Sequence, residues 1–426
     1  MTAEVAIANA SAIALAADSA VTIGDQKIYN SALKLFSLSK VAPVGVMVYG
    51  NADLMDVPWE TLIKTYRKNL AGTTHETLEK YADEFLEYLN ENSALFPPES
   101  QKRWMLGNVT GYFQMLRDEF FEELHPILEA NGQIEASEVQ QALSKVVGEH
   151  HALLRSESYA EGMSDAFAKQ VRSTYLEDFK KIRENVFEKV RTPGALASKL
   201  YDIATFIHTR QVFSTGVSGL VIAGYGEDEI YPTVITFDVE GVIENKLKYR
   251  RNEEKSHSIS TGNECRIIAF AQEDMVATFM SGINPQVLYF LRSYLAKAFN
   301  RMPELLDPKR NPPEEKRRFK SQVDKLLRGF FDEFGDHLRD EQSHPVLRMV
   351  TVLPKDELAA MAEALVNLTA FKRRITESME TVGGPIDVAV ISKGDGLIWV
   401  KRKHYFPAEL NQHFFANYFR GVTNGG

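Results

Sequence analysis

Short stretches of apolar residues, broken by small and polar ones, fill the first fifty positions of the chain. The stretch ending at Tyr49 is continuously apolar and stops at Gly50, which is typical of a strand buried on both faces. Gly24 and Asp25 mark a turn. The pattern predicts four strands, within residues 4–17, 18–22, 31–38 and 44–49. We therefore expect the chain to begin with a buried β-sheet.

Beyond Asp53 the pattern changes to long, charged segments with the composition of helices. Pro97-Pro98 and Asn131-Gly132 interrupt these segments, as helix boundaries do. The clearest helical segments are residues 76–90, 116–130 and 173–190. We expect nearly all of the region as far as about Arg210 to be helical.

Strand signals return after this helical region. Turn residues at 224–228 and at Glu240-Gly241 separate three apolar stretches, which predicts a β-meander. The predicted strands are residues 216–223, 233–238 and 242–249, and later 386–392 and 397–401; the predicted helices are residues 272–282 and 355–377, with a charged helical block broken at 311–313 between them. Strands and helices thus occur in separate runs, which favours an α+β fold over βαβ alternation.

Charge and composition narrow the classes of function. The net charge of -9 argues against broad nucleic-acid binding, and we interpret the basic run 316–320 as a solvated helix face. One cysteine, Cys265, excludes an internal disulfide framework and a multi-thiolate zinc site. His337 and His344 lack the spacing of a metal-binding helix. The chain shows neither a signal-peptide pattern nor an uninterrupted apolar membrane span, so we expect a cytoplasmic protein with no metal, cofactor or membrane contact.

Three residues near the start of the chain carry a chemical hypothesis. Met1 precedes the small residue Thr2, so removal of Met1 exposes a hydroxyl and an α-amine on one residue. An α-amine titrates at about 7.7–8.0 and can act as the base that activates the hydroxyl. Asp18 and Lys34 follow at equal intervals. A lysine near the amine favours its neutral form, and a carboxylate keeps that lysine charged and oriented.

An amide hydrolase of this kind also needs a donor for the oxyanion of its tetrahedral intermediate. A backbone N–H in a water-poor cleft serves this purpose, and a glycine at the end of a strand permits close approach of a substrate. Gly50 is the candidate that the sequence offers.

The same residues resemble those of proteasome β subunits, a family of N-terminal nucleophile hydrolases. Residues 2–53 share its threonine at the mature start, ALAAD ending at Asp18, then VT, KLF from Lys34, and a strand closing in GNAD. Two later segments, residues 219–241 and 383–397, are similar to the family's AGY hairpin and its final GG, strand, turn and strand. The resemblance covers about half of the chain in three pieces.

This resemblance implies a four-layer αββα sandwich carrying long helical insertions. It also implies that Thr2 is the nucleophile, Lys34 the cation that tunes the amine, Asp18 the partner of the lysine, and Gly50 the oxyanion-hole amide. By the same resemblance the core comprises residues 1–54, 211–283 and 353–426, and the insertions are residues 55–210, which include core helices, and 284–352.

The family alignment further assigns residues to substrate binding. Thr22 and Ala52 would pair through their backbones with an extended substrate, as an added strand does. Val21, Ala32 and Val48 would line the primary pocket and favour an apolar side chain. A homo-oligomer, such as a ring, is implied as well. The insertions could cover the cleft, dock a regulatory partner or replace ring contacts.

Two elements depart from the family pattern. Met379 and Val382 occupy the places of an Asp and a Ser that support the amine, where Ser378, Glu380 or Thr381 could substitute. Residues 269–271, Ala-Phe-Ala, replace the family's Gly-Ser-Gly.

Three functions therefore stay open. The first is a threonine peptidase acting on peptides or proteins. The second is a catalytically silent scaffold of the same fold, and the third is an amidase for a small acylated molecule.

Overall fold

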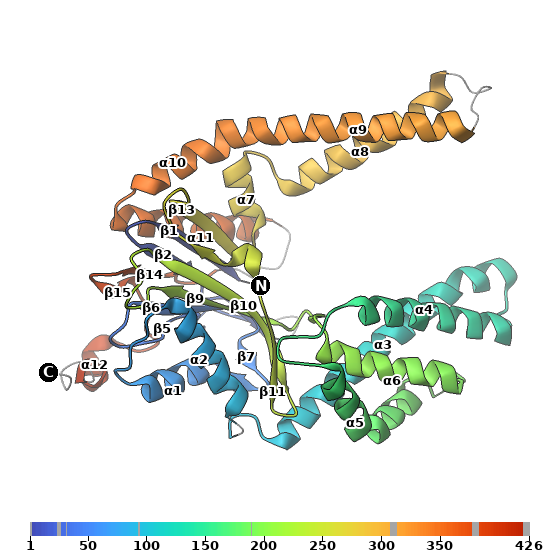
Figure 1. Cartoon of the computed structure of the whole chain (residues 1–426), viewed down its shortest axis with the longest axis horizontal. Coiled ribbons are helices and arrows are strands. Elements are labelled where there is room, and N and C mark those ends of the chain that lie inside the picture. Colours follow the sequence, from blue (N-terminus) through green and yellow to red (C-terminus); the bar gives the residue numbers. More distant parts are fainter. Residues whose placement is uncertain are drawn as a thin grey trace. The chain divides into compact units, whose positions relative to one another are not determined.

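The computed structural model describes residues 2–23, 27–30, 32–92, 94–188, 190–306, 313–376 and 383–420. It is a mixed α/β structure in which the paired strands are antiparallel (Figure 1). The chain divides into two compact units. Unit 1 comprises residues 1–49, 223–234 and 257–426, and unit 2 comprises residues 50–222 and 235–256. Among the described helices, none is long and apolar enough to cross a membrane.

A five-stranded antiparallel sheet forms the centre of unit 1. Its strand order is β13-β1-β2-β14-β15. The strands are β1 (Ala3–Asn9), β2 (Ile13–Ala17), β13 (Cys265–Ala271), β14 (Asp387–Ser392) and β15 (Gly396–Lys401). The predicted strand within residues 4–17 is in fact two strands, β1 and β2. The predicted strand within residues 18–22 overlaps only the short strand β3 (Val21–Ile23), which lies outside this sheet. Strand β13 was not predicted.

The alternation of side chains along β2 separates the two faces of this sheet. Ala14 and Ala16 belong to a core shared with helix α11 (Lys355–Ile375), and small alanines let that helix lie close to the sheet. Helices α7 (Asp274–Ser281) and α10 (His344–Val352) contribute to the same core (Figure 1). Both predicted helices at residues 272–282 and 355–377 are therefore confirmed.

The opposite face of the sheet packs against β5 (Leu35–Ser37) and β6 (Val44–Gly50). A Cβ atom on Gly45 would lie 2.8 Å from Ile391 Cδ1 and 3.4 Å from Leu15 Cδ1, so the strands of two sheets are in close contact here. The strand predicted over residues 31–38 is shorter than expected. The Ala32 amide donates to the Ser19 carbonyl oxygen at 3.1 Å instead of continuing the β5 ladder.

The remaining elements of unit 1 are short strands and helices outside the sheet. Strands β3 and β4 form a hairpin, and the predicted turn at Gly24 and Asp25 lies outside the described residues. Figure 1 shows α8 and α9 as a long hairpin that leads through a π-helical turn into α10. The bounds are β3 Val21–Ile23, β4 Lys27–Tyr29, β12 His257–Ser258, α8 Pro285–Leu306, α9 Pro313–Leu338, η2 Arg339–Ser343, η3 Ala408–Leu410 and α12 Gln412–Arg420.

Unit 2 contains the helical region that the sequence predicts. Helices α3 to α6 pack around one apolar core that includes Phe113, Leu143 and Phe179. Thr77 and Ser164 cap the starts of α2 and α5 with their side chains. The elements are β7 Asp53–Leu54, β8 Val57–Pro58, α1 Trp59–Leu70, α2 Leu78–Glu91, α3 Pro98–Asn131, α4 Ala136–Ser156, α5 Asp165–Val186 and α6 Gly194–Thr209.

The predicted meander is confirmed as β9 (Ser218–Gly224), β10 (Thr233–Ile243) and β11 (Lys246–Arg251), but one of its turns was wrong. Strand β10 continues through Glu240-Gly241 as a bulge, and the turn falls at Glu244-Asn245, whose φ angles are 48° and 58°. The physical reason is burial. The Glu240 carboxylate bonds the Lys248 ammonium at 2.5 Å inside the unit, which a solvent-exposed turn residue would not do.

Candidate functional site

Antiparallel pairing of β1 with β2 brings the start of the first strand to the end of the second. Thr2 directly precedes β1, and Asp18 directly follows β2. The Asp18 amide donates to the Ala3 carbonyl oxygen at 3.1 Å, and the Ala3 amide donates to Asp18 Oδ1 at 3.2 Å. The residue that follows Thr2 is therefore bonded to Asp18 through both backbone and side chain.

The Asp18 carboxylate is fully buried and surrounded by donors. Lys34 Nζ lies 2.5 Å from Oδ1, and the amides of Ala20 and Gly383 donate to Oδ2 at 3.3 and 3.0 Å. Together with the Ala3 amide, these donors make a charge-assisted network that offsets the cost of burying a carboxylate. Two residues separated by 16 positions thus form one buried ion pair.

Thr2 itself has an unusual environment for a hydroxyl side chain. The residue is 4% exposed, and among the described residues its Oγ1 atom has no hydrogen-bond partner. A buried hydroxyl without a partner costs about 1–3 kcal/mol. Since most buried polar groups in native proteins are paired, this one requires an explanation.

A second buried ion pair lies beside the first, and sequence reasoning missed it. Asp387 is opposite Ala17 in the pairing of β14 with β2. Its carboxylate accepts from Lys403 Nζ at 2.6 Å and from the Lys403 amide at 2.8 Å. Burial lowers the pKa of the Lys403 ammonium, the Asp387 carboxylate opposes this shift, and the nearby positive charge of Lys34 adds to it.

One signal for this second pair is present in the sequence. Asp387 is a single acidic residue in the apolar stretch that follows Gly383-Gly384-Pro385. A buried carboxylate needs a partner, so the acid could have been marked. Lys403 could not, because it stands in the basic run 401–404 with other cations.

Two of the three predicted pocket residues, Ala32 and Val48, are hydrogen-bonded to backbone atoms next to the Asp18–Lys34 pair. The Val48 amide donates to the Lys34 carbonyl oxygen at 2.9 Å, and the Ala32 amide donates to the carbonyl oxygen of Ser19, next to Asp18. Val21 begins β3, three residues after Asp18. Thr22 is paired with Ile28 in the β3–β4 hairpin.

The predicted residues Gly50 and Ala52 belong to unit 2. Gly50 has φ of +82°, and a Cβ atom there would lie 2.4 Å from the Val217 carbonyl oxygen. Any other residue would therefore be both strained and in steric conflict. The role of its amide as an oxyanion donor stays a prediction.

Of the two segments that depart from the family pattern, the structure describes residues 269–271 but not residues 377–382. Residues 269–271 lie at the end of β13, where Ala271 pairs with Ala3 and has φ of 63°. Phe270 is fully buried, and its ring centroid lies 5.3 Å from that of Tyr49. The candidate supports at residues 377–382 lie outside the described residues.

The described residues offer no clear metal centre. Within them, no three His, Cys, Asp or Glu side chains gather so that they could hold an ion. His344 Nδ1 lies 3.1 Å from Asp340 Oδ1, one helical turn away, which is an ordinary pair on a helix surface.

Comparisons with known proteins give little further guidance. No protein-family model and no curated protein matches the chain. Among solved structures, "Anbu (ancestral beta-subunit) from Yersinia bercovieri" aligns with 100% of this chain and 98% of its own, at 9% sequence identity and a TM-score of 0.28. A TM-score this low does not define a shared fold.

Proposed function

We propose that this protein is a threonine-type amide-bond hydrolase of the proteasome β-subunit type, with a four-layer sandwich core and Thr2 as its nucleophile after Met1 is removed. One observation carries the proposal. The buried Asp18–Lys34 pair is bonded directly to the residue after Thr2, and the Thr2 hydroxyl is buried without a partner among the described residues. A hydroxyl without a hydrogen-bond partner is free to attack a substrate carbonyl. This role explains why the chain tolerates the free-energy cost of burying it unpaired.

The proposed reaction uses the two groups that Thr2 carries once it is the first residue. Its α-amine accepts the hydroxyl proton, directly or through one water, while Oγ1 attacks the carbonyl carbon of the substrate. The tetrahedral intermediate collapses, and the amine half of the cleaved substrate leaves with the proton relayed by the α-amine. An acyl ester of the substrate remains on Thr2. A water molecule activated by the same amine then hydrolyses this ester.

The neighbouring charges keep that amine neutral and in place. A buried ammonium at Lys34 disfavours a second positive charge nearby, so the amine prefers the unprotonated form that a base requires. The Asp18 carboxylate bonds and orients Lys34, and three backbone amides bond Asp18. The Asp387–Lys403 pair places a second cation, balanced by its own carboxylate, within electrostatic range of Lys34, and we assign the pair a positioning role.

We assign peptides or proteins with an apolar side chain at the cleaved bond as the substrates. Val21, Ala32 and Val48 are apolar, and two of them bond directly to the backbone around the ion pair. We also propose, as the sequence predicts, that the backbones of Thr22 and Ala52 pair with an extended substrate. The Gly50 amide is proposed as the oxyanion donor.

Intact mass and covalent labelling test this proposal. The purified protein should lack Met1. An electrophile that carries both a ketone and an epoxide, and so needs a hydroxyl and a free amine on one residue to form a ring, should add once per chain. Thr2→Ala should abolish the labelling, and Lys34→Met should slow it by at least about 100-fold, as removal of an electrostatic group does. Ser11→Ala, which removes an exposed hydroxyl in the β1–β2 turn, should label normally.

Two outcomes would favour other functions. A protein that lacks Met1, is folded and yet is not labelled would favour the silent scaffold, for which the Ala-Phe-Ala segment at 269–271 is the motivating observation. Labelling of Thr2 without cleavage of any peptide library would favour an amidase for a small acylated molecule. Labelling that persists in Thr2→Ala would refute the proposal.

A further inference from the structure

The hairpin of α8 and α9 has an apolar groove that its own two helices do not fill. The groove has a volume of about 790 Å³ and is lined by Leu295 and Phe299 from α8 and by Leu326, Leu327 and Phe330, among others, from α9. Leu326 is 63% exposed and Phe330 46% exposed. Two helices alone can cover only one side of each other, and no described residue from outside the hairpin lines this side of it.

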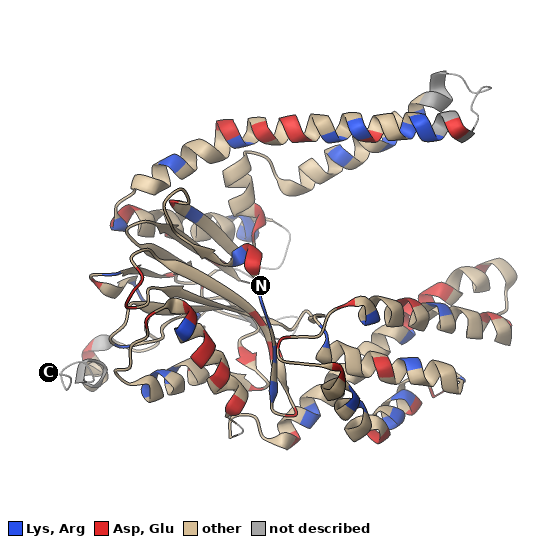
Figure 2. Ribbon diagram, viewed as in Figure 1, with Lys and Arg blue, Asp and Glu red and all other residues tan. Residues whose placement is uncertain are grey.

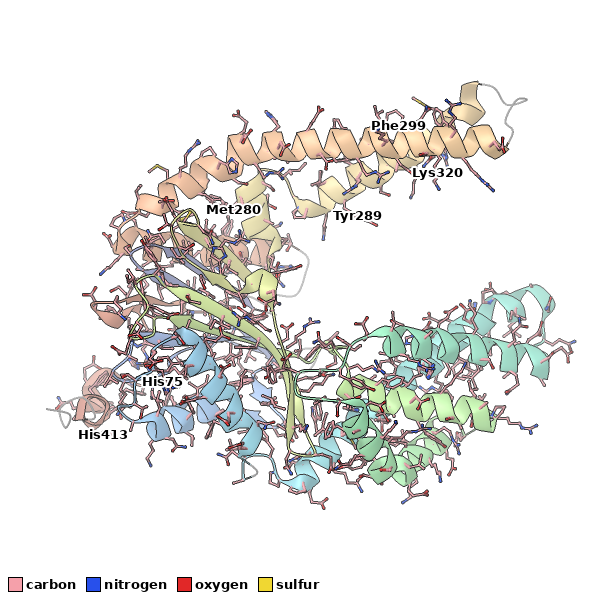
Figure 3. The ribbon with its side chains drawn as sticks, in the orientation of Figure 1. His75, Met280, Tyr289, Phe299, Lys320 and His413 are labelled. Carbon is pink, nitrogen blue, oxygen red and sulfur yellow. The ribbon has the colours of Figure 1, made fainter. Side chains whose placement is uncertain are left out.

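Charged residues along α9 have an order that indicates which partner fits. The stripe of residues 318, 322, 325, 329, 333 and 336 follows helical spacing along α9 and continues to residue 340 in the π-helical turn η2, and all seven are exposed. It has Arg318 and Lys325 before Gly329, and Glu333, Asp336 and Asp340 after it. Figure 2 shows these opposite charges along the helix, and Figure 3 labels Phe299 and Lys320 on the hairpin.

The charge order is antisymmetric about Gly329. Lys325 and Glu333 both line the groove and stand at equal distances along the sequence from Gly329, as do Arg318 and Asp340. When a helix packs against a copy of itself in antiparallel orientation, residues equidistant from the crossing point meet. Lys325 of each copy would therefore meet Glu333 of the other. The acidic residues also have local partners, since Asp336 bonds Arg339 and Asp340 bonds His344.

Gly329 itself is consistent with such a crossing point. A Cβ atom on it would meet no heavy atom of the described residues within 4 Å, so none of them requires a glycine there. Glycine in a helix interior costs about 1 kcal/mol relative to alanine. Its absence of a side chain allows a second helix to approach closely, and it lines the same groove.

We propose that the α8–α9 hairpin is a two-fold interface between copies of this chain, with α9 crossing α9 of a second copy at Gly329. Two hairpins then form a four-helix bundle that buries Leu326, Phe330 and the α8 side of the groove. This surface is self-complementary in the order of its charges about Gly329. It does not depend on the hydrolase activity of Thr2.

The mass of the full-length protein in solution, measured by sedimentation and light scattering, tests the interface. Leu326→Glu with Phe330→Glu should weaken the association by about 100-fold or more, because two central apolar contacts per copy are lost. Loss of the only two-fold contact between copies should halve the mass at a concentration where the interface is occupied.

Charge exchange distinguishes a second copy from an unrelated partner. Lys325→Glu alone and Glu333→Lys alone should each weaken the association by about 10-fold, because each creates two like-charge contacts. The double variant should restore it, since each exchanged residue meets its exchanged counterpart. Lys297→Glu, an exposed α8 residue outside the groove, is the matched control and should have no effect.

A covalent cross-link tests the position of the crossing. With Cys265 replaced by serine, Gly329→Cys should give a disulfide-linked dimer on mild oxidation, whereas Lys297→Cys should not. A wild-type protein that is monomeric at tens of micromolar, a double charge variant that fails to recover, or groove variants with unchanged mass would each overturn the proposal.

Discussion

Replacement of Lys34 by methionine should loosen the sheet that holds Thr2. Removal of one partner from a buried ion pair costs about 3–5 kcal/mol, because an uncompensated charge remains inside. Here the Asp18 carboxylate keeps three amide donors, at 3.2, 3.3 and 3.0 Å, so we expect the lower end of this range, about 3 kcal/mol.

Native-state hydrogen exchange read by mass spectrometry suits this measurement, because it reports opening of peptides in β1 and β2 alone and does not require two-state unfolding of the whole chain. A loss of about 3 kcal/mol corresponds to exchange about 150-fold faster. The control is Lys401→Met, which breaks a pair with Glu363 at 2.6 Å on the surface of the same unit and should change exchange by about 3-fold at most.

A double-mutant cycle with Asp18→Asn separates the pair from its surroundings. The double variant should lose less stability than the sum of the two single variants, by about 2 kcal/mol, because each single variant already removes the shared interaction. Additive losses would mean that the two charges do not stabilise each other. Exchange in Lys34→Met within 3-fold of wild type would refute the reasoning about burial.

Three further predictions concern other buried or strained positions. Burial lowers the pKa of His208 to about 4. Between pH 6.5 and 4 the unfolded chain therefore binds the proton more strongly than the folded chain, so up to about 3 kcal/mol of stability, which is complete above pH 6.5, should be lost as the pH falls to 4. His208→Leu should flatten this pH dependence in denaturant titrations. Gly241→Ala would place Cβ 2.6 Å from the Trp104 ring and should destabilise unit 2 by about 1–3 kcal/mol, whereas Gly107→Ala, with open space in α3, should stabilise it by up to about 1 kcal/mol in the same titrations. Ala271→Gly should not reduce the thermal stability of unit 1, because glycine adopts φ of 63° without the cost of about 1–2 kcal/mol that Cβ imposes; a clear fall in unfolding temperature would contradict this.

The success of the sequence prediction varied with the range of the interactions. Helices with clear ends were found, because capping and periodicity are local properties; α7 ends at Ser281 as Gly282 predicts. Strand β13 was missed, since its seven residues gain their strand character from pairing with β1, far away in the sequence. The turn at Glu240-Gly241 was misplaced for a similar reason, because only the partner Lys248 explains why an acid and a glycine remain within a strand.

In the candidate site, too, the residues that are close in sequence could be predicted and the distant ones could not. Thr2, Asp18 and Lys34 could be marked because all three lie in one short segment with recognisable spacing. The donors that complete the site come from elsewhere: the Gly383 amide bonds Asp18, and Asp387 with Lys403 adds a second charge pair. The hydrophobic pattern alone does not show that these residues, more than 360 positions away from Asp18, are its neighbours; only the family resemblance, which places supports of the amine just before Gly383, pointed to this part of the chain.

The strand order of the central sheet has a consequence for how the protein is made. Strand β1 takes its hydrogen bonds from β2 and from β13, and β2 pairs on its other side with β14. At a synthesis rate of about 5–20 residues per second, the apolar β1–β2 hairpin waits roughly 10–50 seconds for β13 to emerge from the ribosome, and longer for β14. The helical bundle of α3 to α6 is contiguous in sequence and can form during that interval. Nascent chains stalled before residue 265 should therefore expose the first two strands to chaperones and proteases while the bundle is already protected.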